Sequence, residues 1–256
     1  MKDKVTLLQN FICTSNERFQ FMKTNTPKLG KVLGKWPCVV NFDIKNKFTD
    51  KIKNLYEYSF ENLVFENNID INWCDWMIDK LEKIQTPYVI YLIEDVEIFD
   101  IFSHKMLNEI LIDMKKFDVK HLLLGKVQKY MTKVEKRMVA FNADKEVRHF
   151  YFHNALSTPY RFNSFTLSAM FERQLMLDTI KIIRAGEKDK WRLNDTIWML
   201  DKFEKIGMKR LNKQKVAVPN KVYVGVSDIH LPDEAVRNKK KKKKKVKTHK
   251  GRWKES

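Results

Sequence analysis

The sequence predicts an α/β protein with a mostly parallel sheet that is flanked by helices. Two observations carry this prediction. Strand-like and helix-like segments alternate along the first half of the chain, and residues 88–93 form an uninterrupted apolar run that is opened by Pro87. A continuous apolar run is typical of a strand that is buried on both faces, as in sheets whose crossover helices cover both sides. The alternation of strands and helices favours the same architecture.

The first half of the chain is expected to hold five strands and four helices. Apolar runs predict strands at 5–13, 37–43, 62–66, 88–93 and 121–124. Apolar residues at helical spacing predict helices at 17–33, 49–58, 75–84 and 103–117. We expect Pro27 to interrupt or kink the first of these helices. Ser103 is a suitable N-cap for the last.

The second half changes character and is expected to include antiparallel strands. The pattern predicts strands at 147–152, 165–170 and 216–224, and helices at 171–184 and 194–206. No internal repeat and no Pro/Gly/Ser-rich linker separates the halves. We therefore expect residues 1–236 to form one domain with two halves, 1–125 and 126–236.

Composition indicates an ordinary globular protein of a reducing compartment. A chain of 256 residues with 43% hydrophobic content buries roughly 70 to 75% of its unfolded surface. Its three cysteines, Cys13, Cys38 and Cys74, are odd in number and widely spaced, which argues against a disulfide framework or a zinc site. No apolar stretch approaches the ~20 residues of a membrane span, and the first residues lack a signal-peptide pattern. Together these features predict a cytoplasmic protein.

Most of the excess positive charge lies in a tail at residues 237–256. The formal net charge is +18, and this tail holds twelve Lys and Arg against one Glu, which leaves +7 for residues 1–236. So dense a run of like charge does not pack a core and is expected to be disordered. An anionic membrane surface, to which the protein would bind peripherally, polyphosphate and nucleic acid are candidate partners. A solvated tail without a specific partner is the alternative.

Three carboxylates crowd the end of the apolar strand at 88–93. Glu94, Asp95 and Glu97 follow it within a few residues. In open α/β sheets ligands bind beyond the carboxyl ends of the strands, and clustered carboxylates suit a hard divalent cation that carries a phosphorylated substrate. The alternative is that these acids cap a following helix or lie in water. Their mutual repulsion favours a cation or a basic shell nearby.

A P-loop enzyme is excluded by the glycine spacing. The segment GKVLGKW at 30–36 has three residues between its glycines where a Walker loop has four. Trp36 also occupies the position at which Ser or Thr would ligate magnesium. The segment VIYLIED at 89–95 could imitate the acidic strand of such an enzyme, but the glycine spacing rules against it.

Two segments resemble the GT-A glycosyltransferases. TPYVIYLIEDVE at 86–97, preceded by the amphipathic DWMIDKLEKI, resembles the helix and strand that lead into the Asp-x-Asp motif of that family. FTLSAMFERQLMLDTIK at 165–181 is similar to the acceptor-side strand and helix of bacterial and phage-borne members of family 2. The resemblance implies a Rossmann-like GT-A fold, with a nucleotide-binding half at 1–125 and an acceptor-side half at 126–236. It also implies transfer of a sugar from a nucleotide-diphosphate donor to a glycan or other hydroxyl acceptor, with inversion and with Mn²⁺ or Mg²⁺.

The resemblance also implies residue roles in the donor site. Asp95 would ligate the metal with Glu97 as the second ligand, and Glu94 would contact the ribose or act behind the metal ligands. The chain departs from the family here, because the last acid of the motif is Glu in one register and the first acid is missing in the other. This departure puts the metal dependence in question.

Base and ribose contacts come in the family from the loop after the first strand and from the acid after the second. These positions hold Thr14, Asn16 and Arg18, together with Ser15 and Glu17, and then Asp43. Simpler interpretations exist for each group: Thr14 and Ser15 as helix N-caps, Arg18 as a surface charge, and Asp43 as a turn former.

An inverting transferase needs a base for the acceptor hydroxyl, and the resemblance implies Asp195, in WRLND at 191–195. Asn194 and Asp195 also make an ordinary helix start. His153 and the aromatic residues of 151–165 could face the site, although core packing is the simpler interpretation. A noncatalytic or nucleic-acid-binding α/β protein, with its affinity in the tail, is the alternative function.

Overall fold

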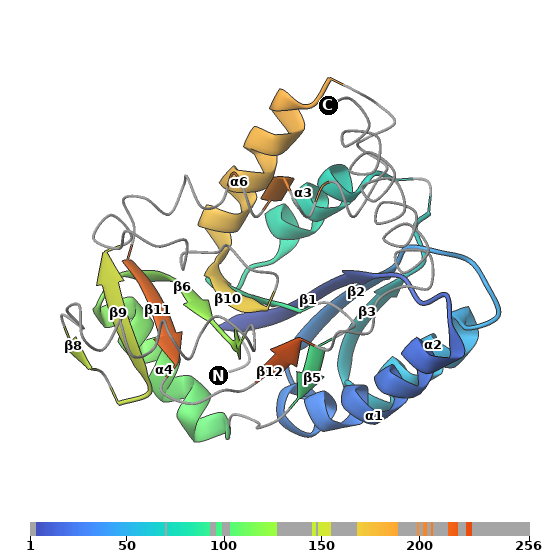
Figure 1. The fold of residues 1–256 in the computed structure, drawn as a ribbon, viewed down its shortest axis with the longest axis horizontal. Helices are drawn as coiled ribbons and strands as arrows, with labels where there is room; N and C mark the ends of the chain where they lie inside the picture. Colours follow the sequence, from blue (N-terminus) through green and yellow to red (C-terminus); the bar gives the residue numbers. More distant parts are fainter. Residues whose placement is uncertain are drawn as a thin grey trace, which may run out of the picture.

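A nine-stranded sheet lies between two layers of helices in the computed structural model (Figure 1). The structure describes residues 4–69, 71–92, 96–98, 103–126, 145–146, 148–154, 168–188, 199, 202–203, 206, 215–219 and 224–226. The predicted α/β class, mostly parallel with an antiparallel part in the second half, is confirmed. The predicted tail and the predicted helix at 194–206 lie wholly or largely outside the described residues.

The strand order of the sheet is β3-β2-β1-β4-β10-β6-β11-β9-β8. Its strands are β1 (Val5–Phe11), β2 (Pro37–Phe42), β3 (Asn62–Glu66), β4 (Tyr88–Tyr91), β6 (Val119–Leu123), β8 (Lys145–Glu146), β9 (Phe150–Asn154), β10 (Ala169–Glu172) and β11 (Lys215–Pro219). A smaller sheet has the order β5-β12-β7, formed by β5 (Val96–Ile98), β12 (Val224–Val226) and β7 (Gly125–Lys126).

The first four strands are parallel, and β1 lies at their centre. Leu7 pairs with Cys38 of β2 on one side and with Ile90 of β4 on the other. The direction changes at β10, which runs antiparallel to both neighbours and pairs Met170 with Ile90 and with Leu122. All four parallel strands therefore end at one edge of the sheet, and β10 begins there.

Among the described residues, the helices that cover the two faces are α1 (Asn16–Leu33), α2 (Thr49–Ser59), α3 (Trp73–Lys83), α4 (His104–Lys116) and α6 (Arg173–Gly186). Figure 1 shows α1, α2 and α4 on one side of the sheet and α3 and α6 on the other. Alternate residues of one strand serve the two cores, since Leu7 packs with the α1, α2 and α4 side and Leu8 with the α3 and α6 side. This two-sided burial explains the continuous apolar run of the strands. No helix in the described ranges is long and apolar enough to cross a membrane.

Several boundaries differ from the sequence-based expectation. Helix α1 continues through Pro27, so of the two expected effects Pro27 does not interrupt the helix, and a kink stays a prediction. Phe171 lies within β10 and does not open α6, because it pairs with Val89 and His121 in the sheet. Ser103 caps α4 as predicted, accepting a hydrogen bond from the amide of Met106 at 3.1 Å.

Two further differences concern short strands. The chain from 216 to 224 was expected to be one strand, but it contributes to two, β11 in the large sheet and β12 in the small one. The residues after the acidic strand were assigned to no helix or strand, and β5 pairs with β12 there. In both cases hydrogen bonding to strands from distant parts of the sequence determines which residues are extended. The β9 strand is also shifted toward the C-terminus relative to the expected 147–152.

Candidate active site at the carboxyl edge of the sheet

The loops that follow β1 and β2 are joined at the carboxyl edge of the sheet. The amide of Asp43, directly after β2, donates to the carbonyl of Phe11, the last residue of β1, at 2.9 Å. Beyond this bond, the side chain of Asn46 donates to the carbonyl of Cys13 at 2.8 Å. The two segments that were expected to contact a nucleotide therefore lie side by side.

Within the β1–α1 loop, Ser15 is the N-cap of α1. Its hydroxyl accepts a hydrogen bond from the amide of Arg18 at 3.2 Å. The pKa of the Glu17 carboxyl is held below its ordinary value, chiefly by the backbone amide of Glu17 and further by the Ser15 hydroxyl. Thr14 and Asn16 are exposed. Of the two N-cap interpretations, the one for Ser15 holds and the one for Thr14 does not.

Arg18 is turned into the protein, with only 6% of its surface exposed. Its guanidinium donates to the carbonyl of Ile12 at 3.5 Å. Its positive charge also acts on Cys13. Burial raises the pKa of the Cys13 thiol, and the charge of Arg18 partly opposes this rise. The interpretation of Arg18 as a surface charge is wrong, since the side chain reinforces the loop after β1 from beneath.

Asp43 is half-buried, and its charge acts on Tyr91, the last residue of β4. The pKa of the Tyr91 hydroxyl is raised above its ordinary value, chiefly by burial and further by the negative charge of Asp43. Trp73 donates its indole NH to this hydroxyl at 3.4 Å. Since β1 pairs with both β2 and β4, the ends of the three strands lie along one edge and contribute to one region.

Amide side chains that the sequence analysis did not select hold this region together. Asn46 accepts from the amide of Phe48 at 2.8 Å while it donates to Cys13. Asn67, after β3, donates to the carbonyls of Phe42 at 2.6 Å and Ile44 at 3.1 Å. These side chains supply the hydrogen bonds that the ladder no longer provides where the strands end. Their signal in the sequence was the accumulation of Asn just after strands, in NFDIKN and FENN.

Tyr56 and Gln9 form a buried polar pair that joins α2 to β1 and reaches the end of β4. Tyr56 of α2 donates its hydroxyl to Gln9 at 2.9 Å, and the amide nitrogen of Gln9 lies 3.5 Å from the carbonyl of Leu92. Gln9 is 3% exposed. Burial raises the pKa of Tyr56, so this hydroxyl remains protonated and serves as a donor. The pair links α2 to the residue at which β4 gives way to the acidic segment.

Ser168 marks the same edge on the antiparallel strand. It precedes β10, accepts a backbone hydrogen bond from Leu124 at 2.9 Å, and is 3% exposed. Its hydroxyl has no hydrogen-bond partner among the described residues. Burying such a group costs about 1 to 3 kcal/mol, which makes Ser168 a noteworthy polar group at this edge that the sequence analysis missed.

The remaining site residues fall partly or wholly outside the described ranges. Glu94 and Asp95 lie between β4 and β5, and Asp195 follows α6 in the chain; none of the three is described. Glu97 is the middle residue of β5 and pairs with Gly225 of β12, although only its backbone is described. Within the described part no group of three His, Cys, Asp or Glu residues is arranged to hold a metal ion.

The sheet order, the antiparallel β10 beside β4, and the loops gathered at the carboxyl edge define a fold of the GT-A type. In solved structures this fold is similar to Staphylococcus aureus TarS 1-349, with 14% identity, a TM-score of 0.55, and coverage of 88% of this chain and 60% of that one. The same protein in complex with UDP gives 12% identity, a TM-score of 0.56 and the same coverage. The mannosyltransferase PcManGT from Pyrobaculum calidifontis, in complex with GDP-Man and Mn²⁺, gives 14% identity and a TM-score of 0.53, over 91% of this chain and 59% of that one.

The chain thus spans about three fifths of the length of these structures. No family model and no curated protein matches it. At identities this low the likeness defines the fold.

Proposed function

We propose that this chain is a glycosyltransferase that moves a sugar from a nucleotide-diphosphate donor to a hydroxyl acceptor, such as a glycan. The observation that carries the proposal is the meeting of the loops after β1 and β2 with the end of β4 at one edge of a GT-A-type sheet. Open α/β sheets bind ligands at this edge. Solved structures of the same fold were determined with UDP, UDP-GlcNAc and GDP-Man.

In this proposal the nucleotide lies over the loops after β1 and β2. Thr14 and Asn16 present exposed polar side chains at the start of α1, and Asp43 accepts hydrogen bonds from the base or the ribose. Arg18 acts from beneath, because its guanidinium supports the carbonyl of Ile12 and supplies positive charge under the loop. Glu94 contacts the ribose from the end of β4.

Asp95 and Glu97 would hold the divalent metal. Carboxylate oxygens are the ligands that Mg²⁺ and Mn²⁺ prefer, and β5 starts directly after Asp95, which brings Glu97 into the same short segment. When bound, the metal neutralises the diphosphate that leaves. PcManGT, of the same fold, was solved with Mn²⁺.

Asp195 is proposed as the base of an inverting transfer. It would remove the proton of the acceptor hydroxyl as the oxygen attacks the sugar carbon from the side opposite the diphosphate. We further propose that residues 1–236 act as one domain, with donor binding in 1–125 and the acceptor side in 126–236. Three buried free cysteines fit a cytoplasmic location.

Calorimetry with a panel of UDP-, GDP-, CMP- and dTDP-sugars, with and without Mn²⁺, tests the proposal. We expect one donor to bind, and we expect Asp95→Ala to abolish the Mn²⁺-dependent part of binding while thermal unfolding is unchanged. Asp50→Ala is a matched control, because Asp50 is an exposed aspartate in the first turn of α2. Donor binding by Asp95→Ala with unaltered Mn²⁺ dependence contradicts the metal assignment, and the absence of binding to every donor contradicts the activity.

The tail supports a second candidate, binding to nucleic acid or to an anionic membrane surface. Eleven net positive charges lie in residues 237–256, and affinity of this origin falls steeply with salt. Binding to RNA or to anionic vesicles that disappears on deletion of 238–256 would assign it to the tail. Donor binding should ignore the same deletion.

A further inference from the structure

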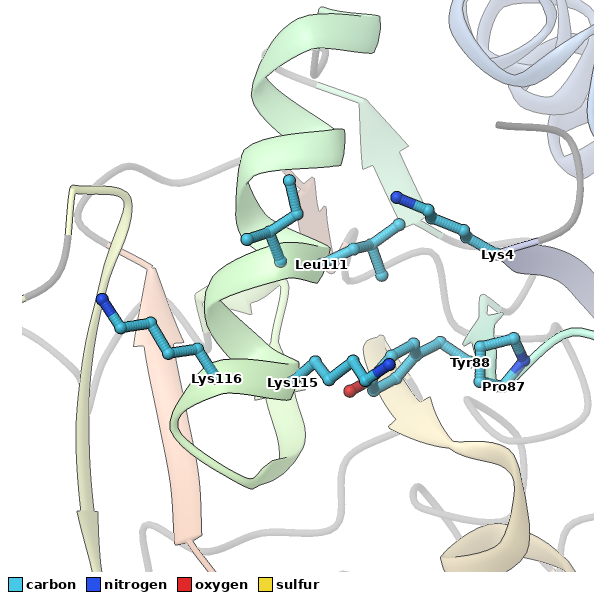
Figure 2. Close-up of a pocket in the computed structure, with 7 residues that line it drawn as sticks. Lys4, Pro87, Tyr88, Leu111, Lys115 and Lys116 are labelled. Atoms are coloured by element: carbon cyan, nitrogen blue, oxygen red, sulfur yellow. The ribbon is translucent and has the colours of Figure 1, made fainter.

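A hollow lies at the amino edge of the sheet, where the chain enters β1 and β4, opposite the candidate donor site. It has a volume of about 570 Å³ and is bounded by α4 and the starts of the two strands (Figure 2). Its lining residues are Lys4, Pro87, Tyr88, Leu111, Ile112, Lys115 and Lys116. A volume of this size accommodates a small molecule.

The walls of the hollow are apolar carbon. Pro87 is exposed, Tyr88 is half-buried, and Ile112 on α4 is 50% exposed. Leu111 is buried at the base. The half-exposed Ile112 gives this surface a side chain that water solvates poorly, so a ligand that covers it gains free energy from the hydrophobic effect.

Ammonium groups stand over this apolar surface. Figure 2 shows Lys115 extending toward the Tyr88 side chain and Lys4 lying above Leu111, whereas Lys116 projects away on the far side of α4. The Lys4 ammonium is held by Asn108 at 3.0 Å. No hydrogen bond or ion pair of the Lys115 ammonium or of the Tyr88 hydroxyl exists within the described part of the chain.

No carboxylate is among the described residues that line the hollow, and two acids that act on Tyr88 are paired with Lys120. Glu172 and Asp118 influence Tyr88, whose pKa is raised first by burial and then by Glu172. Lys120 pairs with Glu172 at 2.5 Å and with Asp118 at 3.0 Å. The charge presented to the hollow is therefore positive.

The polar groups of the hollow are too few to recognise a base or a sugar. Reading a base edge or a ring of hydroxyls takes several fixed donors and acceptors. Among the described residues that line the hollow, the polar side chains are three lysines and one tyrosine, and Lys116 projects away from Tyr88 (Figure 2). Positive charge over aliphatic walls instead complements an anion joined to a hydrocarbon chain.

We propose that the hollow binds an anionic amphiphile, a phosphate or carboxylate joined to an aliphatic chain. The anion lies at the Lys115 ammonium and the Tyr88 hydroxyl, and the chain covers Leu111, Ile112 and Pro87, with Lys4 adding positive charge at the far side of the hollow (Figure 2). The hollow is at the opposite edge of the sheet from the donor site, so this proposal can be tested independently of the proposed glycosyl transfer.

Calorimetry of the full chain with octyl phosphate, kept below its micelle concentration, tests this site. Inorganic phosphate carries the charge without the chain, and octanol carries the chain without the charge. We expect octyl phosphate to bind at least about tenfold more tightly than either, since burial of two methylene groups already supplies that factor. Equal affinities for octyl phosphate and inorganic phosphate would show binding of charge alone, at the tail or elsewhere, and would overturn the proposal.

Variants locate the binding. Lys115→Ala and Ile112→Asn each should weaken octyl phosphate about fivefold or more, through loss of one charge contact or of apolar cover. Lys105→Ala is the matched control, because Lys105 is an exposed lysine of the same helix that does not line the hollow. Thermal unfolding of the variants identifies any loss of fold, and both changes lie at exposed positions. Equal effects of Lys115→Ala and Lys105→Ala contradict the site.

Vesicles distinguish the source of the amphiphile. If it is a lipid within a bilayer, Ile112→Asn should weaken co-sedimentation with phosphatidylglycerol-containing vesicles more than Lys105→Ala does. If it is a dispersed molecule, vesicle binding should be equal for the two variants while the octyl phosphate affinity still differs.

Discussion

The two edges of one sheet carry opposite chemistry in this protein. At the carboxyl edge, amide side chains such as Asn46 and Asn67 bind backbone carbonyls at 2.6 to 3.1 Å. At the amino edge, Pro87 and Leu111 line an apolar hollow under lysine ammonium groups. Both edges are built from the ends of β1 and β4.

The difference follows from how the backbone leaves the strands. At the carboxyl edge several parallel strands end in irregular loops whose carbonyls need donors, and this requirement gathers polar side chains where a polar ligand can also bind. At the amino edge, α4 packs across the strand starts, and the groups left over are aliphatic side chains and flexible lysines. One sheet thereby provides a polar site and an apolar one about a strand length apart.

The largest expected effect concerns Asp195 and catalysis at the carboxyl edge. Asp195→Asn retains size and most hydrogen bonding but removes the proton acceptor, so turnover should fall by about 10²- to 10⁴-fold. Donor affinity, measured by calorimetry, should persist. Turnover within a few-fold of the unmutated protein would contradict the assignment of Asp195 as the base and would favour the alternative that it begins a helix.

Asp43→Ala should weaken nucleotide binding by about 1 to 3 kcal/mol, because a hydrogen bond to a charged carboxylate would be lost. Thermal unfolding should change little, since the bond that joins β2 to β1 uses the backbone amide of Asp43. Asp50→Ala serves again as the control. Unchanged nucleotide affinity would leave Asp43 as a turn former.

Asn46 tests whether the amide network itself shapes the donor site. Asn46→Asp keeps the acceptor for the amide of Phe48 but loses the donor to the carbonyl of Cys13. We expect unfolding to become easier by about 1 to 2 kcal/mol and nucleotide binding to weaken, because the loop after β1 loses its tie. If Asn46→Asp destabilises the fold without any effect on nucleotide affinity, the amide hydrogen bonds stabilise the protein but do not shape the donor site.

The smallest effect is expected at the amino edge, where Thr6 and Thr86 share a buried hydrogen bond at 2.8 Å. Thr86 also donates to the carbonyl of Tyr88 at 3.0 Å. Thr86→Val should cost about 1 kcal/mol of stability, measured by urea unfolding, and Thr6→Val should cost less. Neither substitution should alter donor affinity. A change in donor affinity would contradict the inference that the two edges of the sheet act independently.

Sequence patterning was sufficient for the parallel half of the fold. Strand β3 was located at its observed bounds, and the N-cap Ser103 was identified. These elements are specified locally, by apolar runs and by the side chain that begins a helix. The likeness of segments 86–97 and 165–181 to GT-A transferases led to the fold class that the sheet confirms.

Sequence patterning failed where partners from distant parts of the chain decide. Phe171 is apolar enough for a helix or a strand, and pairing with Val89 and His121 assigns it to β10. The stretch expected at 216–224 divides between two sheets because β6, β9 and β5 supply separate edges. Such boundaries depend on hydrogen-bond partners that no local pattern contains.

By itself, the sequence determined which residue types follow each strand, including Asp43 after β2 and the acids after β4, because strand ends are marked by a change from apolar to polar residues. Only the tertiary structure decided how these ends meet. It turned Arg18 inward, brought Asp43 toward Tyr91, and tied Asn46 to Cys13. The physical reason is that parallel pairing of β1, β2 and β4 aligns their carboxyl ends, so residues far apart in the chain share one edge and satisfy one another's backbone groups.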